Sequence, residues 1–176
     1  MNAYEICEAA EVFITTSRAA RIALSTCAPN NCFHYAHLFA QYPKMHGAKL
    51  QISFPVADDT LRRQLIPVAS PSHEVAALAS LWKKSMGPVE LNCVLLDGVN
   101  DADSHARQLA DFAKAFDLPV KINQYHDVEL GYRQSRRRMS FVRTMWRHGI
   151  KPELYRTDGA DVGAGCGQLR SAAIEP

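Results

Sequence analysis

Residues 90–101, ELNCVLLDGVND, decide the fold class of this sequence. The first seven residues form a largely aliphatic run, which is typical of a strand buried on both faces in a parallel sheet. Asp97-Gly98 ends the run, because glycine permits a tight turn. Asn100 and Asp101 carry side-chain oxygens that can cap the first free amides of a helix. The segment therefore predicts a strand, a polar loop and a helix N-terminus in succession.

A helix and a second strand follow this loop. Apolar residues recur at helical spacing after Ala102, and Pro119 separates them from a short apolar run at 120–123. The helical positions are Ala106, Leu109, Ala110, Ala113 and Phe116. Ligands gather at the carboxyl ends of strands in α/β sheets, so we expect the loop at 97–101 on the functional face.

The rest of the chain alternates in the same way. Strands are predicted at 21–25, 49–54 and 153–156, and helices at 4–15, 33–42, 60–65, after Ser70-Pro71, and at 135–148. Ser70 is predicted to cap its helix, with Pro71 at the first helical position and Val75, Leu78, Leu81 and Trp82 in the buried stripe. Ser135 is predicted to cap the last helix, with Met139, Val142, Met145 and Trp146 on the inner face and Gly149 at its end. The predicted fold is a single α/β domain over residues 1–176, with mainly parallel strands in an incomplete β/α barrel, because five strands cannot close an eight-stranded barrel.

Composition excludes several classes of protein. A hydrophobic content of 47% and a charged content of 22% are those of an ordinary globular protein. No apolar run approaches the roughly 18 residues of a membrane helix, and the acidic start MNAYEICEAAE is unlike a secretory leader, so we expect a cytoplasmic protein with no membrane partner. A net charge of +2 does not by itself imply nucleic-acid binding, and five cysteines do not make a disulfide framework.

Cys166 is the sharpest candidate for chemistry. Gly163, Gly165 and Gly167 surround it with small residues, which would let a reactive sulfur approach a ligand closely. An ordinary free cysteine in a flexible tail fits the same pattern. A lowered thiol pKa would distinguish the two interpretations.

A metal site is not predicted. Cys27 and Cys32, followed by His34 and His37, carry zinc-binding side chains, but their spacing is poor for a tetrahedral site. An iron–sulfur cluster is not expected either, because neither C-x-x-x-C-x-x-C nor C-x-x-C occurs in the sequence.

Several charged and polar residues remain open to two interpretations. The basic run Arg136, Arg137 and Arg138, with Arg133, Arg143, Arg147 and Lys151 nearby, could bind RNA phosphates or form a solvated helix face, and no stacking aromatic is clearly interleaved with it. Asp97 and Asp101 could bind a ribose or a substrate, or serve only the turn and the cap. His105 could point into a site or be an ordinary half-buried histidine.

Four segments carry a resemblance to a known family: LLDGVND at 95–101, HARQLA at 105–110, KIN at 121–123 and RTDGADVGAGCGQL at 156–169. They resemble segments of the radical S-adenosylmethionine (SAM) adenine-C2 RNA methyltransferases, the RlmN/Cfr family. RIALST at 21–26 and ISFPVADDTLRRQLIPV at 52–68 add to them, so the resemblance covers almost the whole chain in order.

This resemblance implies a fold, an activity and site residues. The family fold is a six-stranded partial β/α barrel of the radical-SAM type, here with the N-terminal strands missing. Its members methylate C2 of an adenine in 23S ribosomal RNA, and some also modify transfer RNA. Cys166 matches the cysteine that carries the methyl group, and Ser25 and Ser53 match positions that contact S-adenosylmethionine.

Departures from the family pattern qualify these implications. The cluster-binding C-x-x-x-C-x-x-C lies in the family before the point that matches Met1, Ser-Leu-His is replaced by Ser53-Phe54-Pro55, and an expected asparagine falls near Asp127 or Val128. We therefore expect the C-terminal half of a methyltransferase that is inactive alone and binds S-adenosylmethionine weakly or not at all. The alternatives are a non-catalytic RNA- or protein-binding descendant and, as a lesser one, an independent thiol enzyme that uses Cys166.

The expected partners follow from the same interpretation. Ribosomal or transfer RNA is one. Another is a second chain that supplies the missing barrel half, or a second copy of this chain, because an open strand edge near 21–25 invites pairing.

Overall fold

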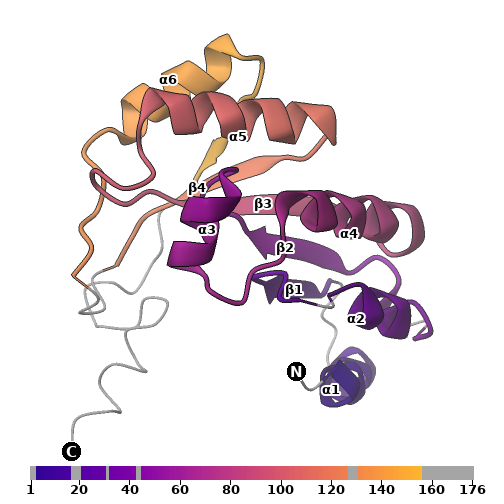
Figure 1. Ribbon diagram of the computed structural model, residues 1–176. Helices are drawn as coiled ribbons and strands as arrows, with labels where there is room; N and C mark the ends of the chain where they lie inside the picture. Colours follow the sequence, from indigo (N-terminus) through magenta and orange to yellow (C-terminus); the bar gives the residue numbers. More distant parts are fainter. Residues whose placement is uncertain (1–2, 17–20, 31, 43–44, 127–130, 156–176) are drawn as a thin grey trace, which may run out of the picture. The chain divides into compact units, whose positions relative to one another are not determined.

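The computed structural model describes residues 3–16, 21–30, 32–42, 45–126 and 131–155 (Figure 1). Helices alternate with the strands of one five-stranded sheet, whose order follows the sequence, β1-β2-β3-β4-β5. The strands are β1 (Ala23–Thr26), β2 (Lys49–Ser53), β3 (Val89–Val94), β4 (Val120–Asn123) and β5 (Glu153–Leu154). The helices are α1 (Ala3–Thr16), α2 (Cys32–Phe39), α3 (Asp59–Leu65), α4 (Ser72–Ser85), α5 (Asp103–Ala115) and α6 (Arg138–Arg147). The α/β alternation predicted from the sequence is confirmed, and the β1–β2 and β4–β5 pairs are parallel.

The chain divides into two compact units. The first consists of Met1–Ser53 and Asp59–Leu91, and the second of Phe54–Asp58 and Asn92–Pro176. β1, β2 and α1 to α4 belong to the first unit, β4, β5, α5 and α6 to the second, and β3 contributes residues to both. Within the described residues no helix has the length and apolar character needed to cross a membrane.

The first unit buries one face of its strands against α2 and α4. Leu50 and Ile52 of β2 are buried, as the alternating pattern of the strand requires. In α4 the stripe is confirmed at Val75, Leu78 and Trp82, while Leu81 is half-buried. The Trp82 indole Nε1 donates a hydrogen bond to the Ala48 carbonyl at 2.9 Å, so this large side chain is buried with its polar atom satisfied.

The predicted cap of α4 is wrong. Ser70 is fully buried and donates to the Pro29 carbonyl at 3.2 Å, and α4 begins at Ser72. Asp59 supplies the cap instead: its Oδ1 accepts the Ser72 N–H at 2.8 Å, and its Oδ2 accepts the Ser72 hydroxyl at 3.2 Å. The cap comes from α3, which local sequence spacing does not reveal.

The second unit packs α5 and α6 against each other (Figure 1). The α5 stripe is confirmed at Ala106, Leu109, Ala110 and Ala113, which are fully buried, whereas Phe116 is 39% exposed. Phe112 of α5 stacks on Phe54 with ring centroids 4.6 Å apart.

The predicted inner face of α6 is only partly correct. Val142 and Met145 are buried, but Met139 and Trp146 are 52% and 54% exposed. Phe141 and Thr144 are buried in their place, so the contact stripe is rotated around the helix. The end of the helix is as predicted, because Gly149 has φ +85° and the Ile150 N–H bonds the Met145 carbonyl at 3.0 Å.

Candidate functional site

The carboxyl ends of β1 and β2 bring the two sequence-predicted serines onto one face. The strands are in parallel register, with Ser25 opposite Gln51 and Thr26 opposite Ile52. Because side chains alternate along a strand, Ser25, Gln51 and Ser53 share the face opposite to buried Leu50 and Ile52. Ser25 is exposed and Ser53 is half-buried, so both hydroxyls are open to a ligand at this edge of the first unit.

A chain of polar contacts extends from Ser25 across this face. The Ser25 hydroxyl donates to Gln51 Oε1 at 3.1 Å, Gln51 Nε2 donates to a Glu90 carboxylate oxygen, and the Lys49 ammonium pairs with the other oxygen. Glu90 is only 5% exposed, and a buried carboxylate requires such partners. The sequence did not indicate this polar chain, since Glu90 stands in what reads as an apolar run. It fixes Gln51 and leaves the lone pairs of the Ser25 hydroxyl free to accept hydrogen bonds.

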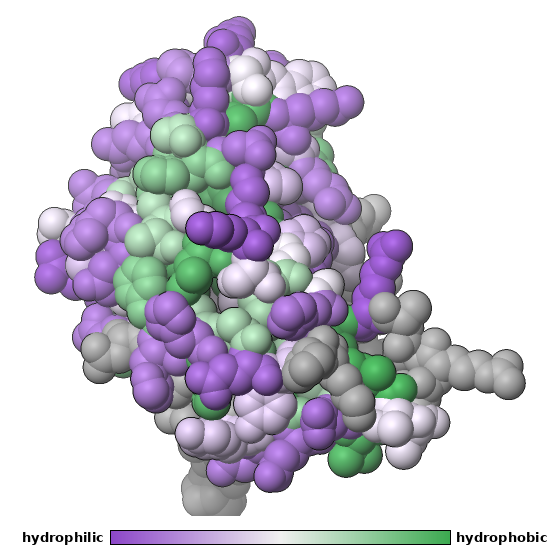
Figure 2. Space-filling model, turned by 90° about the vertical axis from the view of Figure 1, so that its right-hand side faces the viewer, coloured by the Kyte–Doolittle hydropathy of each residue, from purple (hydrophilic) through white to green (hydrophobic). Residues whose placement is uncertain are grey.

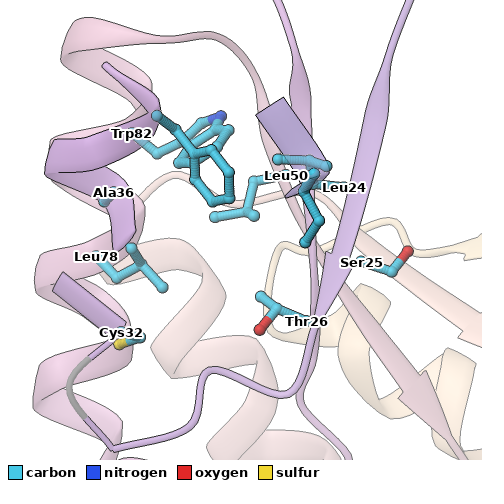
Figure 3. Close-up of a pocket in the computed structure, with 10 residues that line it drawn as sticks. Leu24, Ser25, Thr26, Cys32, Ala36, Leu50, Leu78 and Trp82 are labelled. Carbon is cyan, nitrogen blue, oxygen red and sulfur yellow. The ribbon is translucent and has the colours of Figure 1, made fainter. Parts of the chain in front are cut away.

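The opposite face of β1 and β2 borders a cavity of about 80 Å³ (Figure 3). Leu24 and Thr26 point toward it, whereas the Ser25 side chain points to the other side of the strand (Figure 3). Cys32, Ala36 and Trp82 contribute to its wall. Burial raises the pKa of the Cys32 thiol despite a hydrogen bond with Ser70, so this cysteine is a packing residue at neutral pH.

In the second unit, the polar loop after β3 is held by Asn100. Its Oδ1 accepts the Leu96 N–H at 2.7 Å, and its Nδ2 donates to the Pro55 and Val94 carbonyls at 2.9 Å each. The predicted capping roles of Asn100 and Asp101 are wrong, because α5 begins after Ala102 without a side-chain cap. Asp101 instead accepts the Ser135 hydroxyl at 2.6 Å.

Ser135 and Asp97 connect this loop to the segment before α6. The predicted cap of α6 by Ser135 is wrong, because Arg137 stands at the N-cap without a side-chain cap, and the Ser135 Oγ accepts the Arg137 N–H at 2.9 Å just ahead of the helix. The Asp97 N–H donates to the Arg133 carbonyl at 2.9 Å, and the Asp97 carboxylate faces the Arg136 N–H at 3.5 Å. Asp97 and Asp101 thus have hydrogen-bond partners within the protein, which supports a structural role for both rather than a role in ligand binding.

Four buried polar atoms near β3 and β4 have no hydrogen-bond partner, and sequence reasoning missed them. They are Asn92 Oδ1, Asn123 Oδ1, Tyr125 OH and His126 Nε2. Asn92 and Asn123 stand on the strand face opposite to buried Cys93 and Ile122. Unpaired buried polar atoms are rare because each lowers the stability of the fold by about 1–3 kcal/mol. The Asn92 and Asn123 side-chain oxygens are therefore suited to accept N–H groups of a ligand. His105, whose ring Nδ1 is buried and unpaired, is half-buried on α5.

Cys166 lies outside the described residues, as do Asp127 and Val128. Among the described cysteines, Cys93 is fully buried, its Sγ lies 3.3 Å from the Pro55 carbonyl, and burial raises its pKa to about 12. In the described ranges no group of three or more His, Cys, Asp or Glu side chains is placed to hold a metal ion, and this part of the chain therefore does not fit an iron–sulfur cluster.

The basic run divides into paired and unpaired side chains. Arg137 forms an ion pair with Asp103 at 2.8 Å, and Arg138 donates to the Tyr155 carbonyl at 3.2 Å. Arg143 and Arg147 are exposed along α6. Trp146, predicted on the inner face of this helix, is 54% exposed and is therefore an aromatic that the sequence did not show beside these arginines.

Two curated relatives establish what the chain is similar to. A dual-specificity RNA methyltransferase RlmN from Ruegeria pomeroyi is 31% identical over 135 residues, which are 72% of this chain and 34% of the relative. A probable dual-specificity RNA methyltransferase RlmN from Chlorobium phaeobacteroides is 33% identical over 130 residues, 69% of this chain and 35% of the relative. The chain is a homologue of the RlmN-type radical SAM RNA methyltransferases. It spans about a third of the length of these relatives, and no family model matches it.

Solved structures agree with this homology. A radical SAM methyltransferase from Sphaerobacter thermophilus has a TM-score of 0.75 and 26% identity, over 85% of this RlmN homologue and 44% of that chain. A domain of pyruvate-formate lyase-activating enzyme from Bacteroides vulgatus has a TM-score of 0.65 at 13% identity, over 88% and 91% of the two chains, and this similarity shows the fold alone. The predicted fold class, a mainly parallel radical-SAM-type sheet, is confirmed.

Proposed function

We propose that this chain forms the methyl-carrying part of a radical SAM methyltransferase that modifies C2 of an adenine in ribosomal or transfer RNA. In this proposal Cys166 carries the methyl group, and Ser25 and Ser53 contact S-adenosylmethionine. The observation that supports it best is the parallel register of β1 and β2, which places both serines on one face at the carboxyl ends of the strands in a homologue of RlmN.

The described residues fit S-adenosylmethionine in chemical type. The Ser25 and Ser53 hydroxyls of the first unit can donate or accept hydrogen bonds. In the second unit, taken by itself, the unpaired Asn92 and Asn123 oxygens are hydrogen-bond acceptors. Each set is polar and lies on the face opposite to the buried side of its strands, so no apolar packing has to be disrupted for binding.

The radical step requires chemistry from outside the described residues. A reduced iron–sulfur cluster, when bound, supplies the electron that cleaves S-adenosylmethionine. Because the described residues do not fit a cluster, we propose that its ligands come from a further segment or a second chain, and that this chain alone is inactive.

A test combines the chain with a cluster-bearing N-terminal part of the Ruegeria pomeroyi relative, a reductant, S-adenosylmethionine and ribosomal RNA. Mass spectrometry should detect one added methyl on the Cys166 peptide and none on the Cys27 peptide. Cys166→Ala should abolish methyladenosine in the RNA, while the matched change Cys27→Ala should leave it. Undiminished methylation by the Cys166→Ala mixture would overturn the assignment of Cys166.

In this proposal the second chain docks at the β1 edge of this chain's sheet. β1 is the end strand of the sheet, and a groove of about 360 Å³ runs beside it, lined by α1 residues such as Ile6, Ala10 and Phe13 and by residues 21–24. Apolar residues also reach the surface toward the bottom of the face drawn in Figure 2, the level at which α1 lies in Figure 1. An edge strand with an apolar border favours pairing with a strand of another chain or a second copy.

A second candidate is a non-catalytic RNA- or protein-binding descendant of the same fold. It is favoured by the cluster of basic residues on and before α6. Calorimetric titration with S-adenosylmethionine separates the candidates. Binding that is weakened by Ser25→Ala and Ser53→Ala supports the methyltransferase, whereas no binding, together with no methyl on Cys166 in the reconstituted mixture, supports the descendant.

A further inference from the structure

The segment from Gly131 to Pro152 has a charge unlike that of the whole chain. It carries seven basic residues and no acidic one, in a chain whose net charge is +2. The basic residues are Arg133, Arg136, Arg137, Arg138, Arg143, Arg147 and Lys151. Such a local excess of one sign creates a positive potential that attracts polyanions.

The C-terminal half of α6 keeps its cations available. Arg143 and Arg147 are one helical turn apart and exposed, and Lys151 is exposed just beyond the helix. No ion pair joins these three to any residue in the part of the chain that the structure describes. The Asp111 carboxylate of α5 lies 3.6 Å from His148 Nδ1.

Trp146 stands among these cations with 54% of its surface exposed. Since position 146 follows 143 by three residues, the indole and the Arg143 guanidinium lie on neighbouring parts of one helix face. Exposing a large aromatic side chain to water is unfavourable in free energy. Exposed apolar surface of this kind often marks a binding site.

A groove of about 360 Å³ lies beside the indole. Trp146, Gly149, Ile150 and Lys151 line it. Gly149, with φ +85°, turns the chain at the end of α6, and the Lys114 ammonium of α5 lies 3.7 Å from where a Cβ on Gly149 would stand. The groove therefore has an aromatic wall and two ammonium groups at its border.

We propose that this groove binds single-stranded RNA, with a base stacked on Trp146 and the adjoining phosphates held by Lys114, Lys151, Arg143 and Arg147. Single strands are favoured over duplexes because a duplex keeps the faces of its bases stacked inside. An acidic protein segment would satisfy the cations but would leave the indole without a stacking partner.

This site goes beyond the proposed methyltransferase function. The start of α6 is tied to the carboxyl end of β3 through Ser135 and Asp101. Trp146 lies eight residues farther along the helix than Arg138, about 12 Å at the usual rise, so within the second unit the groove lies at the other end of α6 from the contacts with the loop after β3. RNA binding here requires neither S-adenosylmethionine nor Cys166.

The test measures fluorescence anisotropy of a labelled single-stranded oligouridine with the full chain at several salt concentrations. Trp146→Ala should weaken binding between about 5-fold and 100-fold, while Trp146→Phe retains most of the affinity. Arg143→Ala combined with Arg147→Ala should make the slope of log K against log salt shallower by about 1.4. Met139→Ala, an exposed apolar change on the same helix, and Lys84→Ala on α4 are the matched controls and should change little.

Intrinsic fluorescence gives an independent readout. The chain has two tryptophans, and Trp82 is buried, so quenching by RNA should be lost in Trp146→Ala while the Trp82 emission reports that the fold is intact. The proposal is overturned if Trp146→Ala binds oligouridine as tightly as the parent. It is also overturned if a duplex of equal length, or polyglutamate, binds as tightly and quenches as strongly. Methyl transfer to Cys166 is scored separately, so the two proposals fail independently.

Discussion

At the scale of single residues, the Asn100 side chain makes more hydrogen bonds to the backbone than its place in a polar loop indicates. It is fully buried and satisfies one amide and two carbonyls through its side chain. Asn100→Ala should lower the free energy of unfolding by roughly 2–4 kcal/mol, because three backbone groups lose their partner together. Urea denaturation measures the change, with the exposed Asn30→Ala as control. A loss below about 0.5 kcal/mol would show that water replaces the side chain.

Asp59 makes stability depend on pH. Burial alone would raise its pKa, but hydrogen bonds from Arg62 and Ser72 and the charge of Arg62 outweigh burial and lower the pKa. A carboxylate with a lowered pKa stabilises the fold above its unfolded pKa of about 3.9, and this contribution is lost as pH falls through the lower folded value.

We therefore expect Asp59→Asn to cost about 1 kcal/mol at neutral pH, a modest value because a third of the side chain is exposed. The difference between parent and variant should shrink below about pH 4. Unfolding by urea at several pH values checks this, with Glu8→Gln on the exposed side of α1 as control. A difference that stays constant down to acidic pH would contradict the ionic contribution.

At the scale of elements, the cavity between β1, β2, α2 and α4 is an imperfection in packing. Ala36 of α2 is 3% exposed and lines this space of about 80 Å³. Ala36→Leu should raise the free energy of unfolding by about 1 kcal/mol, since three added carbons are buried and some rotamer freedom is lost. Thermal or urea unfolding measures it, and Ala77→Leu on the exposed side of α4 is the matched change outside the cavity. A destabilised Ala36→Leu would mean that the site is overpacked.

At the scale of the whole molecule, the edge of β1 is expected to govern association. The Lys49 N–H bonds the Ile22 carbonyl at 2.9 Å, so the alternation of the strand directs the backbone groups of Ala23 to the open edge. We expect concentration-dependent self-association, because β1 ends the sheet and the groove beside it is apolar.

Ala23→Pro removes the outward N–H while leaving the Ile22–Lys49 bond, and it should weaken this association. Analytical ultracentrifugation across a range of concentrations measures it. Ala23→Ser, which retains the backbone N–H of residue 23, is the matched control. A proline at an exposed position elsewhere, such as Ala77→Pro, would break α4 and so could not serve as the control. A parent chain that sediments as a monomer at every concentration would rule out pairing through this edge.

The sequence by itself determined the order of strands and helices and the alternation along β2. The buried stripes of α4 and α5 also followed from it, because hydrophobic periodicity is a local property. It also placed Ser25 and Ser53 at strand ends, although their binding role remains a proposal.

Only the tertiary structure decided which distant groups meet. Asp59, rather than Ser70, caps α4, Asn100 bridges the loop to Pro55, and Glu90 lies buried between Gln51 and Lys49. It also turned Trp146 outward, because the direction in which α6 meets α5 depends on packing between elements, and a helical period alone leaves that rotation open.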